Sequence, residues 1–451
     1  MLLLLMGATL QVPEDFAQIQ DALDEAQPGD TIIVQAGTYA ALETQRDGTE
    51  QAPITIEAVG EVVVQAEEGE SALKASHAWY RWEGLVFDGG LGGKDVLRTG
   101  GADHAEYRGI EVRNAYGGDC IDLRNASDVL IVDSSIHHCL AGSPSEQVDS
   151  HGVTGDSVFD VVIQDTEIAW TTGDAVQFSP PREPWDRVLI QGCTLSSGPL
   201  DQDIGPFSAG DVIGENALDT KVGEGTPRIE VIDTVVRGYN GAIVNAAAFN
   251  IKEEVLATLD GVVVEDCDIG FRLRHPASVQ VYDALVTDTS RAFRLEDGLE
   301  GVVIAHATVI GGEALEYAGG DPVDPIYANL LVLGALPVEW EEAGRVATEE
   351  DFVEGYQLAS SSSAIDAGVV VDSGVDLAGQ PRDEAPDLGA FEWLPPQDSD
   401  DPDDSDPDDS DPDDSDPGPS PTEDCGCAST GLRSSLSGLV VLVLLGWSRR
   451  R

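Results

Sequence analysis

A six-residue pattern, apolar-x-polar-x-x-apolar, recurs along the middle of the chain. Its copies begin at Val86, Val112, Ile131, Ile163, Ile190, Val231, Val264, Val281 and Ile304. Each copy alternates apolar and polar residues like a half-buried strand, and none is long enough to bury its apolar face without a neighbouring coil. The repeat therefore predicts an all-β solenoid of stacked coils.

Aligning the copies predicts a further strand in each coil, at residues 120–124, 152–156, 175–179, 217–221, 242–246, 270–274 and 292–296. We expect the second positions to point inward: Ile121, Val153, Val176, Leu218, Ile243, Phe271 and Phe293. Strand alternation sends the third and fifth positions outward. The third positions are Asp122, Thr154, Gln177, Asp219, Val244, Arg272 and Arg294, and the fifth are Arg124, Asp156, Ser179, Lys221, Ala246, Arg274 and Glu296. One sheet thus carries a polar ladder, acidic at one end and basic at the other.

Apolar residues at helical spacing, Ile19, Ala22, Leu23 and Ala26, predict a short capping helix before a first strand at 31–34. Residues 19–39, with 47–49 and 52–56, closely resemble the N-terminal end of right-handed parallel β-helix proteins of the pectate-lyase-like superfamily. Residues 364–368, 376–382 and 387–392 resemble the segment that closes many bacterial members. The resemblance implies a right-handed parallel β-helix domain over residues 12–394. The longest interval, between Ile190 and Val231, contains a Gly-, Ser- and Asp-rich insertion at 196–214, and such insertions often lie at a binding face.

The two ends of the chain differ from this domain in composition. Residues 1–11 are apolar and predict a truncated signal peptide. Residues 395–423 predict a disordered linker, since twelve aspartates between 398 and 416 repel one another and no apolar residue separates them. Residues 424–451 combine Cys425 and Cys427 with a short apolar helix and three terminal arginines. This end resembles the MYXO-CTERM type of sorting signal of myxobacteria and relatives, which implies export and attachment to the cell surface or outer membrane; a plain membrane tail is the alternative.

The formal net charge of -60 excludes nucleic acid as an expected partner, because its binding needs clustered Lys and Arg. Calcium and cationic partners fit this charge better. Cys193 and Cys267 lie two coils apart, about 10 Å, which is beyond disulfide reach. Cys120 and Cys139 lie near consecutive coils, where either a disulfide or two free thiols are open alternatives. We expect a monomer.

Lys221 is the strongest candidate for catalysis, because it lies beside the long insertion and shares an outward face with Asp219. β-Elimination of a uronate needs a base for the proton next to the carboxylate and a cation that neutralises the carboxylate. In the superfamily's lyases a lysine or arginine on the exposed sheet is the usual base, so the resemblance implies Lys221 as base and Asp219 as metal ligand or orienting group. Arg272 is a further catalytic candidate, Asp122, Gln177, Arg274 and Arg294 are expected to bind substrate, and Asp219 with Asp174 could hold Ca²⁺.

Three alternatives to a lyase remain open. The ladder could consist of cross-strand ion pairs on a non-catalytic adhesin or glycan-binding protein. Two carboxylates, Asp122 with Asp174 or Asp219, could act as in a glycoside hydrolase. Ser150 and His151 are a weak nucleophile–base pair, because adjacent strand residues point to opposite faces. His137 and His138 have no partner at metal spacing and are interpreted as turn residues.

Overall fold

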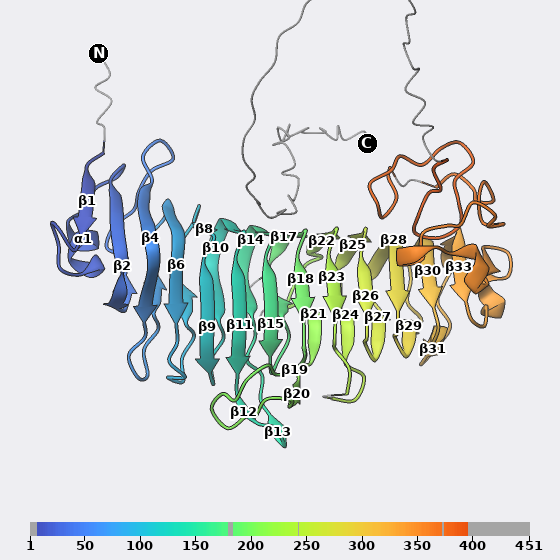
Figure 1. Ribbon diagram of the computed structural model, residues 1–451, viewed down its shortest axis with the longest axis horizontal. Helices are drawn as coiled ribbons and strands as arrows, with labels where there is room; N and C mark the ends of the chain where they lie inside the picture. Colours follow the sequence, from blue (N-terminus) through green and yellow to red (C-terminus); the bar gives the residue numbers. More distant parts are fainter. Residues whose placement is uncertain (1–6, 179–183, 242, 372–373, 396–451) are drawn as a thin grey trace, which may run out of the picture. The chain divides into compact units, whose positions relative to one another are not determined.

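The computed structural model describes residues 7–178, 184–241, 243–371 and 374–395. Within them the chain winds into a parallel β-solenoid in which each coil passes through three sheets (Figure 1). The predicted linker 395–423, apart from its first residue, and the predicted sorting segment 424–451 lie outside the described residues. Among the described residues, no helix is both long enough and apolar enough to cross a membrane.

The first sheet carries the polar ladder. Its strands are β3 (Leu42–Glu43), β5 (Leu73–Ala75), β7 (Leu97–Thr99), the start of β10 (Ile121–Val132), the start of β14 (Val153–Gln164), β16 (Val176–Phe178), β21 (Asn216–Thr220), β24 (Ala247–Ile251), β27 (Ile269–Arg274), β29 (Arg291–Glu296) and β31 (Glu313–Ala318).

The second sheet follows the first along the chain. Its strands are β1 (Thr9–Val12), β2 (Thr31–Ala40), β4 (Ile54–Gln65), β6 (Tyr80–Asp88), β8 (Glu106–Arg108), the ends of β10 and β14, β17 (Asp186–Gln191), β22 (Arg228–Ile232), β25 (Leu256–Asp260), β28 (Ser278–Thr287), β30 (Val303–Ile310) and β32 (Ile326–Ala328). One inward residue from each coil forms a continuous parallel column of thirteen: Leu10, Ile32, Ile56, Trp82, Tyr107, Ile131, Ile163, Ile190, Val231, Leu259, Val281, Ile304 and Tyr327.

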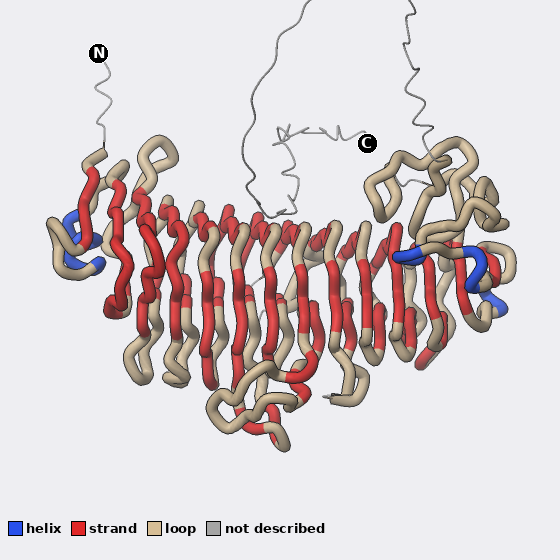
Figure 2. The backbone as a smooth tube through the Cα atoms, in the orientation of Figure 1, coloured by secondary structure: helices blue, strands red, loops and turns tan. Residues whose placement is uncertain are grey.

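The third sheet completes each coil. It contains the ends of β2, β4, β6, β28 and β30, together with β9 (Glu111–Tyr116), β11 (Ser135–Leu140), β15 (Glu167–Thr171), β18 (Thr194–Ser196), β23 (Val235–Arg237), β26 (Val263–Glu265), β33 (Leu330–Leu333) and β34 (Gly344–Val346). The strand segments of all three sheets stack coil upon coil in Figure 2.

The six-residue repeat turns out to be a corner between two sheets rather than a single strand. Its third residue takes positive φ in eight of the nine copies, at Asn114, Asp133, Asp165, Gly192, Asp233, Asp266, Asp283 and His306. Asn, Asp and Gly tolerate this left-handed conformation best. Most copies start in the second sheet, whereas Val86, Val112 and Val264 start in the third. In the first copy the inward residue is Phe87, which pairs with Val112, rather than Val86.

Both ends of the solenoid are closed by chain that packs on the core. The helix α1 (Ile19–Glu25) buries Ile19, Ala22 and Leu23, which confirms the predicted capping helix. The segment at 31–34 is the second strand rather than the first, since β1 pairs with it. At the other end, the short 3₁₀ turns η1 (Val338–Trp340), η2 (Glu349–Asp351) and η3 (Glu354–Tyr356) precede a closing segment in which Ala390 and Phe391 pack on Leu285.

The strand predicted at 242–246 is wrong. Leu218 pairs with Phe249, and Phe249 pairs with Phe271, so β24 provides this coil of the first sheet. Val244 is instead 87% exposed in the loop before β24. The rings of Phe249, Phe271 and Phe293 stack with centroids 5.3 and 4.6 Å apart, and this aromatic column fills the core where a smaller Ile243 would not.

Two insertions leave the coils between the third and first sheets. The hairpin of β12 (Gly142–Ser143) and β13 (Glu146–Gln147) lies beside that of β19 (Gly198–Pro199) and β20 (Val212–Ile213), at the lower edge in Figure 1. Gln147 joins them, because its amide donates to the Val212 carbonyl and accepts from Gly214 N–H. Cys120 and Cys139 form a disulfide. Cys193 and Cys267 are free and buried.

Candidate functional site

The ladder runs along the outward face of the first sheet, one residue per coil. Its register-matched members are Glu43, Lys74, Arg98, Asp122, Thr154, Gln177, Asp219, Asn250, Arg272, Arg294 and Glu316. Asn250 takes the place predicted for Val244, and Lys252, which follows β24, takes the place predicted for Ala246. The corrected ladder is therefore polar at every coil.

Asp219 lies at the centre of the ladder and is almost fully buried. Its Oδ1 accepts from Asn250 Nδ2 at 2.9 Å, and Lys252 Nζ lies 2.9 Å from the same oxygen. Lys221 Nζ lies 3.5 Å from Oδ2 and donates to Gln177 Oε1 at 2.8 Å. The Lys221 side chain is 38% exposed, against 18% for that of Lys252, so Lys221 is the more accessible cation.

A buried chain of hydrogen bonds lies beside Lys221. The Gln177 amide nitrogen is 2.6 Å from both His151 Nε2 and Asp174 Oδ2. His151 Nδ1 lies 2.8 Å from Asp119 Oδ1, so a neutral His151 donates to Asp119 and accepts from Gln177. Burial alone would lower the pKa of His151, but the hydrogen bond to Asp119 and the charges of Asp119 and Asp174 outweigh burial and raise it. A proton on Nε2 would break the contact with Gln177.

Three carboxyl groups along the ladder have raised pKa values, and two of them lie beside the lysines. Burial, with the charge of Asp219, raises the pKa of Asp174 to about 7. Burial and the charges of Asp149 and Asp219 raise the pKa of Glu215. Further along the ladder, burial raises the pKa of Asp122 to about 6 against the hydrogen bond from Arg124. Four carboxyl groups, those of Asp149, Asp174, Glu215 and Asp219, thus surround the two lysines. The sequence did not indicate this cluster, because Asp149 and Glu215 lie in the insertions.

A cationic stripe, defined here as Lys221, Lys252, Arg272, Arg274, Arg291 and Arg294, covers four consecutive coils. These six cations pair with three carboxylates, Asp219, Glu296 and Glu316. Glu296 alone is contacted by Arg272, Arg274 and Arg294. Burial alone would raise the pKa of Glu296, but the hydrogen bonds and charges of Arg272 and Arg294 outweigh burial and lower it. Within this set of ion pairs, six cations thus share three carboxylates, in a protein whose net charge is -60.

Asp219 and Asp174 do not fit a calcium ion. Calcium takes six to eight oxygen ligands, and the oxygens of Asp219 already face Asn250, Lys221 and Lys252. Both oxygens of Asp174 accept hydrogen bonds, Oδ1 from Asn216 and Oδ2 from Gln177. Within the described ranges, no three His, Cys, Asp or Glu side chains are placed to hold a metal.

The carboxylate pairs considered for a glycoside hydrolase lie at different separations along the ladder. Asp122 and Asp219 are three coils apart, about 14 Å at the usual strand spacing, which exceeds the separation in either class of glycoside hydrolase. Asp174 and Asp219 lie on adjacent coils. Ser150 and His151 do not form a nucleophile–base pair, because Ser150 donates to the Gly118 carbonyl while His151 faces Asp119.

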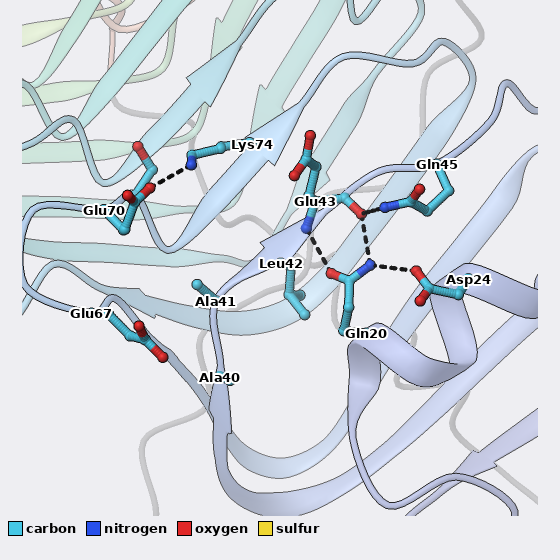
Figure 3. A pocket seen from close by; sticks show the side chains of 11 residues that line it. Gln20, Asp24, Ala40, Ala41, Leu42, Glu43, Gln45, Glu67, Glu70 and Lys74 are labelled. Atoms are coloured by element: carbon cyan, nitrogen blue, oxygen red, sulfur yellow. Dashed lines mark hydrogen bonds and ion pairs between the residues drawn. The ribbon is translucent and has the colours of Figure 1, made fainter.

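A hollow of about 380 Å³ lies at the N-terminal end of the first sheet, between α1 and β3 (Figure 3). Its charged lining is acidic except for Lys74, which pairs with Glu70 at 2.5 Å. Gln20 bridges the helix to β3 by accepting from Glu43 N–H. This lining would repel an anionic polymer, so the cationic stripe is the better candidate for one.

Residues 14–107 match the family model described as Chondroitinase B, a stretch that ends before the stripe begins. No curated protein matches the sequence. Among solved structures, the pectate lyase Pel9A has a TM-score of 0.55 at 11% identity, covering 83% of this chain and 90% of its own. PfbA, a surface adhesin of Streptococcus pneumoniae, has a TM-score of 0.51 at 10% identity, covering 73% and 95%. At these identities the likeness concerns the fold alone: the chain has the pectate-lyase-like parallel β-helix fold.

Proposed function

We propose that the protein binds an anionic polysaccharide along the cationic stripe. The observation that carries this proposal is the gathering of six cations on four adjacent coils of a strongly acidic chain. A net charge of -60 repels a polyanion at long range, so a polyanion needs a local cationic surface within about one Debye length, roughly 8 Å. The cationic stripe provides such a local cationic surface on the first sheet.

The direction of the stripe suits an extended polymer. Coils repeat about every 4.8 Å along the solenoid axis, so a chain lying along that axis meets a new cation at each coil from Lys221 to Arg294. Arginine forks pair well with carboxylate and sulfate groups. The structural likeness to both a pectate lyase and an adhesin supports a polysaccharide ligand, with or without cleavage.

The double variant Lys221→Gln/Arg274→Gln tests this proposal. These are the two most exposed cations of the stripe that can be removed without orphaning a carboxylate: Asp219 keeps Lys252, and Glu296 keeps Arg272 and Arg294. Each lost charged contact is expected to weaken binding at least about tenfold, so the double variant should bind about 100-fold more weakly. Isothermal titration of the full-length protein with polygalacturonate, alginate and chondroitin sulfate measures this effect.

The matched control is Arg187→Gln/Arg228→Gln, which makes the same charge change on the second sheet. Both arginines are exposed and pair with Asp186. The control should keep the affinity of the unchanged protein. Equal losses in both double variants, or equal binding of a neutral dextran, would argue against a site on the stripe.

A lyase activity at Lys221 is the second candidate, because Lys221 is the exposed cation at the end of the buried hydrogen-bond chain. In β-elimination the base removes the proton beside the uronate carboxylate, the glycosidic C–O bond breaks, and a double bond forms in the new end sugar. Lys252 lies one coil from Lys221 and could neutralise the carboxylate, whereas Arg272 lies two coils, about 10 Å, away. Lys221 Nζ lies 3.5 Å from the Asp219 carboxylate, so a bound polymer would have to disturb this pair before Lys221 could act as base.

For a lyase we expect ultraviolet absorbance from unsaturated uronate on at least one of pectate, alginate and chondroitin sulfate. Lys221→Ala should abolish that signal, while Lys74→Ala, a ladder lysine five coils away, should retain it. Activity that survives in Lys221→Ala would place the base elsewhere. If the unchanged protein produces no such absorbance on any of the three polymers, binding without cleavage remains the proposed function.

We further propose that the protein is exported and anchored at the cell surface. The Cys120–Cys139 disulfide supports export, because disulfides persist in oxidising compartments. The resemblance of residues 424–451 to a sorting signal supports anchoring. Truncation before residue 424 should release the protein into the medium, as measured by immunoblotting of culture fractions, and unchanged surface retention would contradict the anchor.

A further inference from the structure

The insertion between β18 and β21, residues 197–215, folds back against the third sheet. Leu200, Phe207 and Ile213 bury their side chains on Leu140 of β11 and form a small core of their own. Beside this core, Asp201 and Gln202 reach the imidazole of His138, and Trp170 of β15 stacks on the other side at a centroid distance of 4.8 Å. His138 is therefore one polar point of attachment for this insertion, in addition to the hydrogen bonds of Gln147 with Val212 and Gly214 and the one that Trp170 donates to the Pro199 carbonyl.

His138 forms an unusual pair with His137. Their Nδ1 atoms are 2.7 Å apart, which is hydrogen-bond distance, so a single hydrogen lies between the two rings. The Nε2 atoms point outward to different carboxylates: His137 Nε2 is 3.2 Å from Glu111 Oε1, and His138 Nε2 is 3.1 Å from Asp201 Oδ1. One carboxylate belongs to the sheet and the other to the insertion.

Counting hydrogens shows that the neutral pair cannot satisfy both carboxylates. Two neutral imidazoles carry two N–H groups in total. One is used between the rings, so one Nε2 stays bare and faces a carboxylate with its lone pair. A single added proton gives both Nε2 atoms a hydrogen, and each then donates to its own carboxylate. A second added proton would place two hydrogens between the Nδ1 atoms and is excluded sterically.

We propose that the His137–His138 pair is a proton-operated latch that fixes the 197–215 insertion to the third sheet when the pair carries one extra proton. When that proton leaves, Gln202 can donate to the bare His138 Nε2, from which it lies 3.3 Å away, and the charged contact with Asp201 is lost. The insertion is then held by its apolar contacts and by neutral hydrogen bonds alone. Its last residue adjoins Asn216, which binds Asp174 beside the ladder, so the latch lies next to the proposed polysaccharide face without being part of it.

The charged groups around the pair agree with a single charge. On β9, Glu111 pairs with Arg113 as well as His137, and Arg113 also pairs with Asp88 of β6. On the insertion, Asp203 lines a hollow of about 520 Å³ together with His137 and Gln202. The Oδ1 atom of Asp203 accepts from Ala209 N–H. Burial and the charge of His137 lower the pKa of His138 against the pull of Asp201. A charged His137 therefore suppresses a second charge on His138.

Hydrogen exchange of the full-length protein tests the latch. Amides of residues 199–213 should exchange about tenfold more slowly at about pH 5.5 than at about pH 8, after correction for intrinsic rates, because one charged hydrogen bond is gained. Asp201→Asn, which keeps both histidines and changes an exposed side chain, should lose this pH dependence. His138→Gln, which can hydrogen-bond but cannot titrate, should lose it as well.

His104→Gln is the matched control, since His104 also faces an aspartate, Asp128, but lies between β7 and β8, at the corner of the first and second sheets rather than on the third. It should exchange like the unchanged protein. Equal protection of the insertion at both pH values in the unchanged protein, or pH dependence that persists in Asp201→Asn, would overturn the latch. Because the readout is local exchange, the result does not depend on whether the stripe binds a polysaccharide.

Discussion

Phe271→Ala is expected to destabilise the solenoid by about 3–5 kcal/mol, the usual cost of removing a buried phenylalanine ring. Phe271 is fully buried, and its ring stacks between those of Phe249 and Phe293. Each coil contacts only its neighbours, so a cavity here separates the coils on either side and cannot be closed by rearrangement elsewhere. The free energy of unfolding, measured by denaturant titration with circular dichroism, checks this expectation.

Val244→Ala is the control for that experiment. Sequence alignment of the coils places Val244 and its neighbour Ile243 in the first sheet, whereas the structure places Val244 in an exposed loop. The control should change stability by less than about 0.5 kcal/mol. A large loss in Val244→Ala together with a small loss in Phe271→Ala would mean that 242–246 is the strand after all and that β24 is misplaced.

Arg382→Ala is expected to cost about 3–5 kcal/mol, because it breaks a buried ion pair and leaves its partners uncompensated. The Arg382 side chain is 4% exposed and contacts Asp283 of β28, which is 1% exposed, and Glu392 at 3.0 Å. It also donates to the Gly389 carbonyl. This one side chain therefore ties the closing segment to a strand about a hundred residues earlier, and its loss should expose residues 364–392 to proteases.

The cost of Arg382→Ala should depend on pH. Burial raises the pKa of Asp283 to about 7 even with Arg382 beside it. A carboxyl group whose pKa is raised on folding stabilises the folded state below its unfolded pKa, and this contribution is lost as the pH rises through the folded value. The variant should therefore lose less stability at about pH 5, where Asp283 is protonated, than at about pH 8.

Arg345→Ala is the control, since Arg345 lies in the same terminal region but is exposed and donates to the Ser363 carbonyl. It should cost less than about 1 kcal/mol at either pH. A thermal unfolding midpoint that falls equally in both variants would show that Arg382 does not hold the closing segment.

Much of the ladder could be predicted from the sequence. Asp122, Gln177, Asp219, Arg272 and Arg294 lie in the predicted column, because apolar–polar alternation makes the facing of a strand unambiguous once its core residue is known. The prediction failed at 242–246, where Ala-Ile-Val-Asn-Ala fits the strand pattern about as well as Ala-Ala-Phe-Asn-Ile of β24 does. Only the need for a ring beside Phe271 distinguishes the two strands, and that need arises from packing between coils.

The buried partners of the ladder could not be predicted in the same way. Lys252 was missed because its coil was misaligned. Asp119, His151 and Glu215 lie in turns and insertions, where no periodicity relates a residue to the sheet. His137 and His138 were interpreted as turn residues, but both lie within β11, with positive φ at His138. The contact of His138 with Asp201 joins residues 63 positions apart.

The sequence by itself determined the parallel solenoid, its capping helix, the existence of an outward polar ladder and the strongly acidic charge. These follow from local periodicity and composition, which each coil repeats. The tertiary structure alone decided which strand completes the coil after β21, which carboxylates surround the lysines, and which cations join into one stripe. Those relations depend on how coils of unequal length align across their insertions, and alignment is set by the packing of neighbouring cores rather than by distance along the chain.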